Sequence, residues 1–114
     1  MILLEILMET ICSDNSCPVY DTLRMIGNKW VLLILAQLMG GTKRFGELKK
    51  AIPEISPKML TQQLRKLEQE GLVERTVYAE VPPKVEYSLT AKGLALEPVF
   101  EQIIIWGRKH GGRP

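Results

Sequence analysis

The stretch from Ser56 to Gly71, SPKMLTQQLRKLEQEG, decides the fold of this chain. Ser56 is a favoured helix N-cap, proline suits the first helical position, and Gly71 is typical of the residue that follows a helix. The pattern between them predicts a helix with an apolar stripe on one side and a polar, acid-free side opposite. The stripe consists of Leu60, Leu64 and Leu67, and the polar side consists of Lys58, Gln62, Arg65 and Gln69.

A β-hairpin is expected directly after this helix. Residues 72–78 are rich in β-forming residues, and Val85, Tyr87 and Leu89 alternate with polar residues, so they share one face of a strand. The segment between the two strands contains Pro82 and Pro83, which cannot continue a strand. We therefore expect a mainly α protein with a small β-hairpin, which is the outline of a winged helix-turn-helix.

Four further helices are expected, at residues 18–26, 29–39, 44–51 and 91–109. The second is apolar nearly all round and is expected in the middle of the core. In the third, Phe45, Leu48 and Ala51 are expected to face inward, and the turn at residues 52–55 completes a helix-turn-helix. Pro98 is expected to kink the last helix.

The polar side of the Ser56 helix carries residue types that hydrogen-bond to base edges and phosphates, so we expect it in the major groove of DNA. A merely solvated surface is the alternative interpretation. The expected base readers are Lys58, Gln62 and Arg65, with Ser56 and Thr61 on phosphates or base edges. Backbone contacts are expected from Lys43, Arg44 and Lys49, and a minor-groove or phosphate contact from Lys84 on the wing. Arg75 has apolar neighbours and is expected to brace the hairpin internally.

The last helix carries more apolar surface than one face needs. Leu96, Val99, Phe100 and Ile103 can pack inward, whereas Ile104, Ile105 and Trp106 are left over. Surplus apolar surface on a small protein indicates a partner, so we expect a homodimer formed through the terminal helices. The expected interface residues are Phe100, Ile103, Ile104 and Trp106. The alternative is that the N-terminal tail folds back over this surface.

Composition and length exclude several classes of protein. The chain has 114 residues, enough for one domain, and its net charge of +2 is too small for a nucleic-acid-coating protein. Glu5 and Glu9 interrupt the apolar N-terminal stretch, which argues against a signal peptide, and no run is long enough to span a membrane. Two cysteines and His110 do not make a zinc site, so we expect no metal. No pattern typical of an enzyme's catalytic residues occurs, so we expect no enzymatic activity and no cofactor. The expected location is the cytoplasm.

At this point the residues resemble the HxlR-type winged helix-turn-helix regulators. The likeness rests on segments that occur in the family's order: Cys17-Pro18, Ile26–Trp30, Arg44–Leu48, Ile55–Thr61, Leu67–Val73, Pro82–Thr90, Trp106-Gly107 and His110. It covers residues 17–110 as one domain and leaves a tail or short helix at 1–16 and a C-terminal tail at 111–114. The resemblance implies a transcription regulator that binds a palindromic operator in double-stranded DNA as a homodimer.

Cys17 occupies the place where some members of this family sense electrophiles or oxidants. It directly precedes Pro18, so it is expected at a helix N-terminus, where the helix dipole favours a thiolate. Asp14 and Asp21 oppose this effect with negative charge. Oxidation could link Cys17 to Cys17 of a second subunit or to Cys12. The alternative is a small buried hydrophobic residue.

Two other functions remain open from the sequence. Winged helices can serve as protein-interaction modules without binding DNA, and the acid-free face of the Ser56 helix argues against that role. The second is a regulator that responds to a small-molecule ligand at the dimer interface, near Trp30, Phe100 and Trp106.

Overall fold

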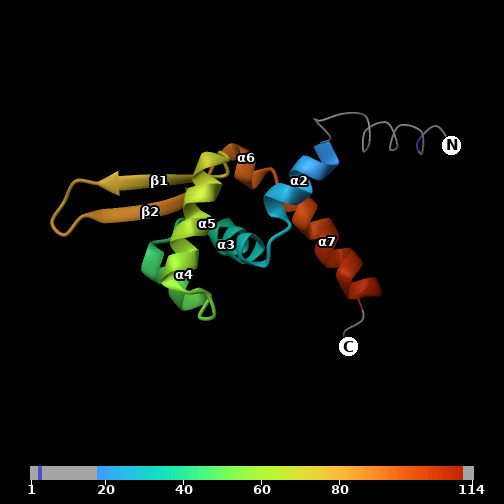
Figure 1. Cartoon of the computed structure of the whole chain (residues 1–114), viewed down its shortest axis with the longest axis horizontal. Coiled ribbons are helices and arrows are strands. Elements are labelled where there is room, and N and C mark those ends of the chain that lie inside the picture. The colour runs from blue at the N-terminus through green and yellow to red at the C-terminus, as the bar shows by residue number, and fades with distance from the viewer. Residues whose placement is uncertain (1–2, 4–17, 112–114) are drawn as a thin grey trace.

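The computed structural model describes residue 3 and residues 18–111. A helical body lies in the middle, a β-hairpin extends from one end, and two helices project from the other (Figure 1). The elements in order are α2 (Pro18–Ile26), α3 (Lys29–Met39), α4 (Phe45–Ala51), α5 (Pro57–Gln69), β1 (Val73–Tyr78), β2 (Lys84–Leu89), α6 (Ala91–Leu94) and α7 (Glu97–His110). The expected mainly α fold with one hairpin is confirmed.

Local caps fix the ends of the central helices. Asn28 Oδ1 accepts a hydrogen bond from the backbone N–H of Trp30 at 2.8 Å and begins α3. Ser56 Oγ accepts one from the N–H of Met59 at 3.1 Å and begins α5. Gly71 follows α5 with a φ of +75°, a conformation that favours glycine. The predicted bounds of α2 and α3 are confirmed, and α4 begins one residue later than expected, after Arg44 as its N-cap.

The core is a single cluster built by α3, α4, α5 and the base of the hairpin. Its fully buried members include Ile34, Leu35, Leu48, Ile55, Leu60, Leu64, Leu67 and Leu72. Helix α3 lies in the core as expected, with Val31, Ile34, Leu35 and Leu38 buried, but Leu32 and Leu33 are exposed on its outer side. Ala51 is also exposed, and Ile52 takes the inward position at the end of α4.

The hairpin is a two-stranded antiparallel sheet in which Val73 pairs with Leu89, Arg75 with Tyr87 and Val77 with Val85. Tyr87 is buried, and Val85 and Leu89 pack against the core, which confirms that the three residues share one face and shows that this face points inward. Lys43 adds an isolated bridge, exchanging backbone hydrogen bonds of 3.0 and 2.8 Å with Tyr87. This bridge ties the segment before α4 to the hairpin.

The C-terminal segment forms two helices, so the expected single kinked helix was wrong. Leu94 ends α6 and Glu97 begins α7, with Pro98 in the first turn of α7. Proline has no N–H to donate and its ring would collide with the carbonyl four residues earlier, which here belongs to Leu94. The chain therefore breaks at Ala95-Leu96 and restarts with the proline at a position that tolerates it.

Helix α6 is bonded to the end of α5 through three successive carbonyl groups. Lys92 Nζ donates to the carbonyl of Glu70 at 2.8 Å, Thr90 Oγ1 donates to that of Gly71, and the N–H of Thr90 donates to that of Leu72. Thr90 Oγ1 also accepts from the N–H of Gly93, which confirms Thr90 as the predicted cap. The three carbonyls belong to the C-cap of α5 and to the two residues that follow it, so these bonds tie the start of α6 to the chain just after α5.

Within residues 18–111, no helix combines the length and the apolar character needed to cross a membrane.

Candidate nucleic-acid interface

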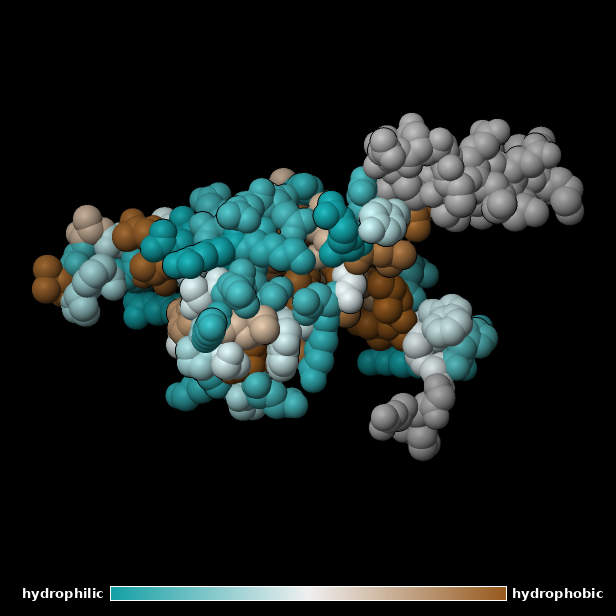
Figure 2. All heavy atoms as spheres, viewed as in Figure 1, coloured by the Kyte–Doolittle hydropathy of each residue, from teal (hydrophilic) through white to brown (hydrophobic). Residues whose placement is uncertain are grey.

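Helix α5 presents the polar side that its sequence predicted. Leu60, Leu64 and Leu67 are buried, and the four residues opposite, Lys58, Gln62, Arg65 and Gln69, are exposed. Because Ser56 and Gly71 fix the two ends and the leucines fix the rotation of the helix, this polar side has one orientation relative to the core. We call these four residues the reading face. Figure 2 shows hydrophilic residues over this part of the molecule.

All three predicted base readers lie together in one shallow hollow along α5, lined by Pro57, Lys58, Thr61, Gln62 and Arg65. Seven residues separate Lys58 from Arg65, which corresponds to about 10 Å along a helix, or about three base-pair steps. Thr61 Oγ1 donates to the carbonyl of Pro57 at 2.9 Å, so it can still accept a hydrogen bond. The Ser56 hydroxyl accepts the capping bond and can still donate one.

A second hollow lies between α5 and the hairpin, and it contains Arg75, which the sequence analysis expected inside the hairpin. Arg65 and Arg75 both line it, together with Thr61, Leu64, Glu68 and Tyr87. Arg75 is exposed, so the expected internal brace was wrong. Its pairing with Tyr87 places it on the hairpin face that turns toward α5. Strand alternation could have indicated this face, but the sequence does not show where along the hairpin the core ends.

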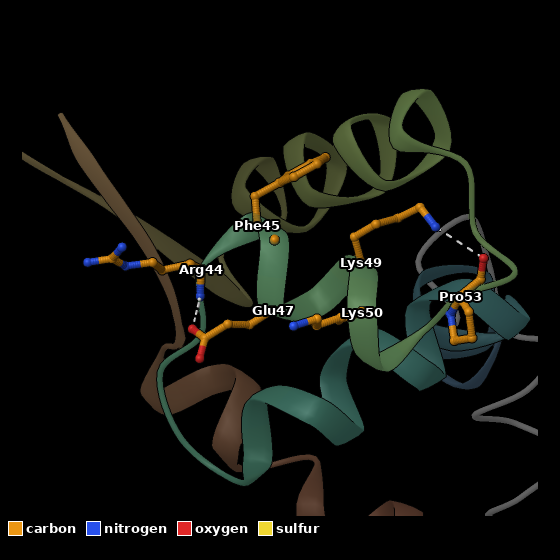
Figure 3. Close-up of a pocket in the computed structure, with 7 residues that line it drawn as sticks. Arg44, Phe45, Glu47, Lys49, Lys50 and Pro53 are labelled. Atoms are coloured by element: carbon orange, nitrogen blue, oxygen red, sulfur yellow. Dashed lines mark hydrogen bonds between the residues drawn. The ribbon is translucent and has the colours of Figure 1, made fainter. Parts of the chain in front are cut away.

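Helix α4 carries three cations around another open hollow (Figure 3). Arg44, Lys49 and Lys50 line it with Phe45, Gly46, Glu47 and Pro53. Glu47 Oε1 accepts from the N–H of Arg44 at 2.8 Å, and Lys49 Nζ donates to the carbonyl of Pro53 at 3.1 Å. Arg44 and Lys49 extend away from each other in Figure 3. The arrangement suits contacts with separate phosphates, and Lys50 is a member that the sequence interpretation did not include.

Lys43 does not line this hollow. Its backbone belongs to the bridge with Tyr87, and its Nζ lies near Gly40, the residue that ends α3. A cation near the C-terminus of a helix interacts favourably with the helix dipole.

The predicted wing cation, Lys84, is the first residue of β2 and lies back from the tip of the hairpin. Its Nζ is 3.4 Å from Glu86 Oε2 and 5.1 Å from the centre of the Tyr78 ring. Both contacts hold the ammonium group against the strands. The tip itself consists of Val81, Pro82 and Pro83, which are all exposed.

The predicted partner surface on α7 is exposed from Glu101 to His110. Ile103, Ile104 and Trp106 each have at least half of their surface exposed. Leu96 and Phe100 pack against the chain's own core, whereas Val99 and Ile103, which were also expected to pack inward, are exposed. Hydrophobic residues collect over α7 in Figure 2.

The structure does not place the two cysteines considered in the sequence analysis. Cys12 and Cys17 lie outside the described residues. In the part of the chain that the structure describes, no three histidine, cysteine or acidic side chains come together as a group that could hold a metal ion.

Comparison with known proteins agrees with this geometry. A model of the HxlR-like helix-turn-helix family matches residues 25–113. The HTH-type transcriptional regulator YdeP of Bacillus subtilis is 52% identical over 99 residues, which are 87% of this chain and 77% of YdeP.

Two solved structures have the same fold. The HTH-type transcriptional regulator YtcD matches with a TM-score of 0.80 and 48% identity, over 86% of this chain and all of that one. The redox regulator HypR in its reduced form matches with a TM-score of 0.78 and 47% identity, over 83% of this chain and 94% of that one. The chain therefore belongs to the HxlR-like helix-turn-helix family of transcriptional regulators.

Proposed function

We propose that this protein is a cytoplasmic regulator that binds a two-fold symmetric operator in double-stranded DNA as a homodimer. The observation that carries the proposal is the reading face, which is exposed, rigidly oriented and free of acidic side chains. A solvated surface has no need to exclude acids over three turns of helix. A surface that approaches phosphates does, because each carboxylate there would be repelled.

In this proposal α5 lies in the major groove. Lys58, Gln62 and Arg65 read base edges, and Ser56 and Thr61 bind phosphates or base edges close to them. Lys43, Arg44 and Lys49 bind the phosphate backbone, and Lys84 contributes positive charge on the wing. The DNA-binding unit spans residues 17–110, with 1–16 and 111–114 as tails.

The dimer forms through the terminal helices, with Phe100, Ile103, Ile104 and Trp106 in the interface. The exposed apolar surface of α7 supports this proposal, because such surface is unfavourable in water unless it is covered. Ile105 offers a matched comparison. It is 52% exposed, against 51% for Ile103, but helical spacing places it among Glu101, Arg108 and Lys109 on the charged side.

We further propose that Cys17 makes the regulator responsive to oxidants or small electrophiles. Cys17 directly precedes the first residue of α2, where the helix dipole favours the reactive thiolate. A relative of the same fold, HypR, is a redox regulator known in reduced and oxidised forms.

Selection of operator sequences from random duplex DNA tests the function, with the protein fully reduced and again after diamide treatment. We expect a two-fold symmetric motif with half-sites about 10 bp apart. Oxidation should abolish selection by the wild-type protein and leave the Cys17→Ser variant active. The Cys12→Ser variant should remain sensitive if Cys17 pairs with Cys17 of the second subunit, and should become insensitive if it pairs with Cys12.

Each result has one meaning. If oxidation leaves the selected motif unchanged, Cys17 is not a switch, and DNA recognition stands. If no motif appears at any salt concentration, the regulator does not read DNA through α5, and a role as a protein-interaction module takes its place.

A further inference from the structure

The tip of the hairpin is an apolar surface that the proposed DNA contacts do not use. Val81 is 100% exposed, and Pro82 and Pro83 beside it are exposed as well. Farther back on β1, Val77 and Tyr78 are 53% and 41% exposed, but as neighbours in a strand they face opposite sides of the hairpin and do not join the tip. Within the described residues, an apolar cluster this exposed at the end of the hairpin adds little to the packing, and it indicates contact with a partner.

The charges of the hairpin show that this contact is not an electrostatic clamp on phosphates. Residues 73–89 contain three acids, Glu74, Glu80 and Glu86, and two bases, Arg75 and Lys84. Lys84 is held by Glu86 and the Tyr78 ring, and the exposed Glu80 next to Val81 is repelled by phosphates. Stabilisation at the tip must therefore come from apolar contact.

The position of the tip relative to α5 matches the spacing of the DNA grooves. The hairpin meets α5 where Arg65 and Arg75 line a common hollow. From Arg75 to Val81 the chain advances six residues, which is at most about 20 Å in extended conformation. A helical turn of DNA is about 34 Å, so the neighbouring minor groove lies roughly 17 Å from the major groove that α5 enters. The length of the hairpin beyond Arg75 is therefore sufficient to span that separation.

We propose that Val81, Pro82 and Pro83 form a wedge that enters the minor groove beside each half-site, presses on a base step and bends the operator. This inference rests on the proposed operator binding. Apolar side chains, proline among them, are the groups that proteins insert at base steps from the minor groove. Two adjacent prolines restrict the backbone, so the wedge loses little conformational freedom on binding.

The wedge adds specificity at a position that no polar side chain reads. Pyrimidine–purine steps bend and unstack most easily, so TA or CA/TG is favoured where the tip presses. The regulator then recognises base edges through the reading face and deformability through the wing.

The test measures the bend of a selected operator by energy transfer between its ends, in complexes with the wild type, Val81→Ala and Val77→Ala. Val77→Ala removes the same atoms from an exposed valine on the strand, outside the wedge. We expect a bend with the wild type and the control, and a smaller bend with Val81→Ala. The wild type should bind an operator with a flexible flanking step about tenfold more tightly than one with a stiff step, a difference within the usual effect of one mismatched base pair. Val81→Ala should show no such preference. The dependence of affinity on salt should not change, because no charge is removed.

Several outcomes overturn the wedge. A tight wild-type complex with a straight operator refutes it alone, and so does an equal bend with Val81→Ala. If the bend is equal and the wild type forms a complex with another protein that Val81→Ala does not form, the tip binds a protein partner instead. If the wild type binds no operator at all, the proposed function fails and the wedge fails with it.

Discussion

Replacement of Gly93 by alanine should lower the free energy of unfolding, because the added methyl group would collide with its neighbours. Gly93 is buried in α6, and a Cβ there would overlap the carbonyl oxygen of Leu72 and stand 3.1 Å from Leu89 Cδ2. The leucine side chain can move, but the carbonyl cannot, because it already accepts from the N–H of Thr90. Overpacking of a core usually costs ~1–3 kcal/mol, and an immobile backbone oxygen places this site near ~2–3 kcal/mol.

Urea denaturation at one fixed protein concentration measures this cost, because a dimer's stability depends on concentration. With a urea slope of ~2 kcal/mol/M, the midpoint of Gly93→Ala should fall by about 1 M. Gly46→Ala is the matched control, since Gly46 is exposed in α4 and a Cβ there meets nothing within 4 Å. Alanine should stabilise that helix by ~0.5–1 kcal/mol. An unchanged midpoint for Gly93→Ala, or an equal fall in both variants, would refute the packing argument.

Three further predictions concern DNA binding and assembly. Arg65→Ala should cost ~1–3 kcal/mol on the selected operator and relax preference at one base step; an equal loss on random DNA would identify a phosphate contact instead. Lys49→Ala should weaken binding to all sequences alike and lower the slope of log affinity against log salt by ~1, which a salt titration checks. Ile103→Glu should convert the dimer to a monomer in light scattering and Ile105→Glu should not; dissociation of both would remove the distinction between the two sides of α7.

The elements that the sequence predicted well are those whose signals are local. Ser56 and Gly71 mark the two ends of α5, and the leucine stripe fixes which side faces outward, so the reading face could be derived from residues 56–71 alone. Thr90 likewise marked the start of α6. In each case a side chain or backbone conformation within one turn of the boundary decides the outcome.

The features that were missed depend on contacts between distant segments. Leu32 and Leu33 are as apolar as their buried neighbours on α3, and only the arrangement of the other helices leaves them exposed. The hairpin continues past the edge of the core at Arg75, which turns an expected brace into a cation beside Arg65. The break before Pro98 is accompanied by the packing of α6 against Leu72, which a helix pattern does not contain.

The hydrogen bonds from Thr90 and Lys92 to the carbonyls that follow α5 have a consequence for how a signal could travel. Thr90 and Lys92 fasten the chain just after α5 to the segment that leads, five residues after Lys92, into α7. In the proposed dimer, a change in the angle between the two α7 helices would therefore turn both α5 helices as attached bodies. The regulator could then lose its operator with every base contact intact, because the two reading faces would no longer match the distance between half-sites. Such a state would bind operators in which the spacing between half-sites is changed, and changes of the bases within the half-sites would not restore binding.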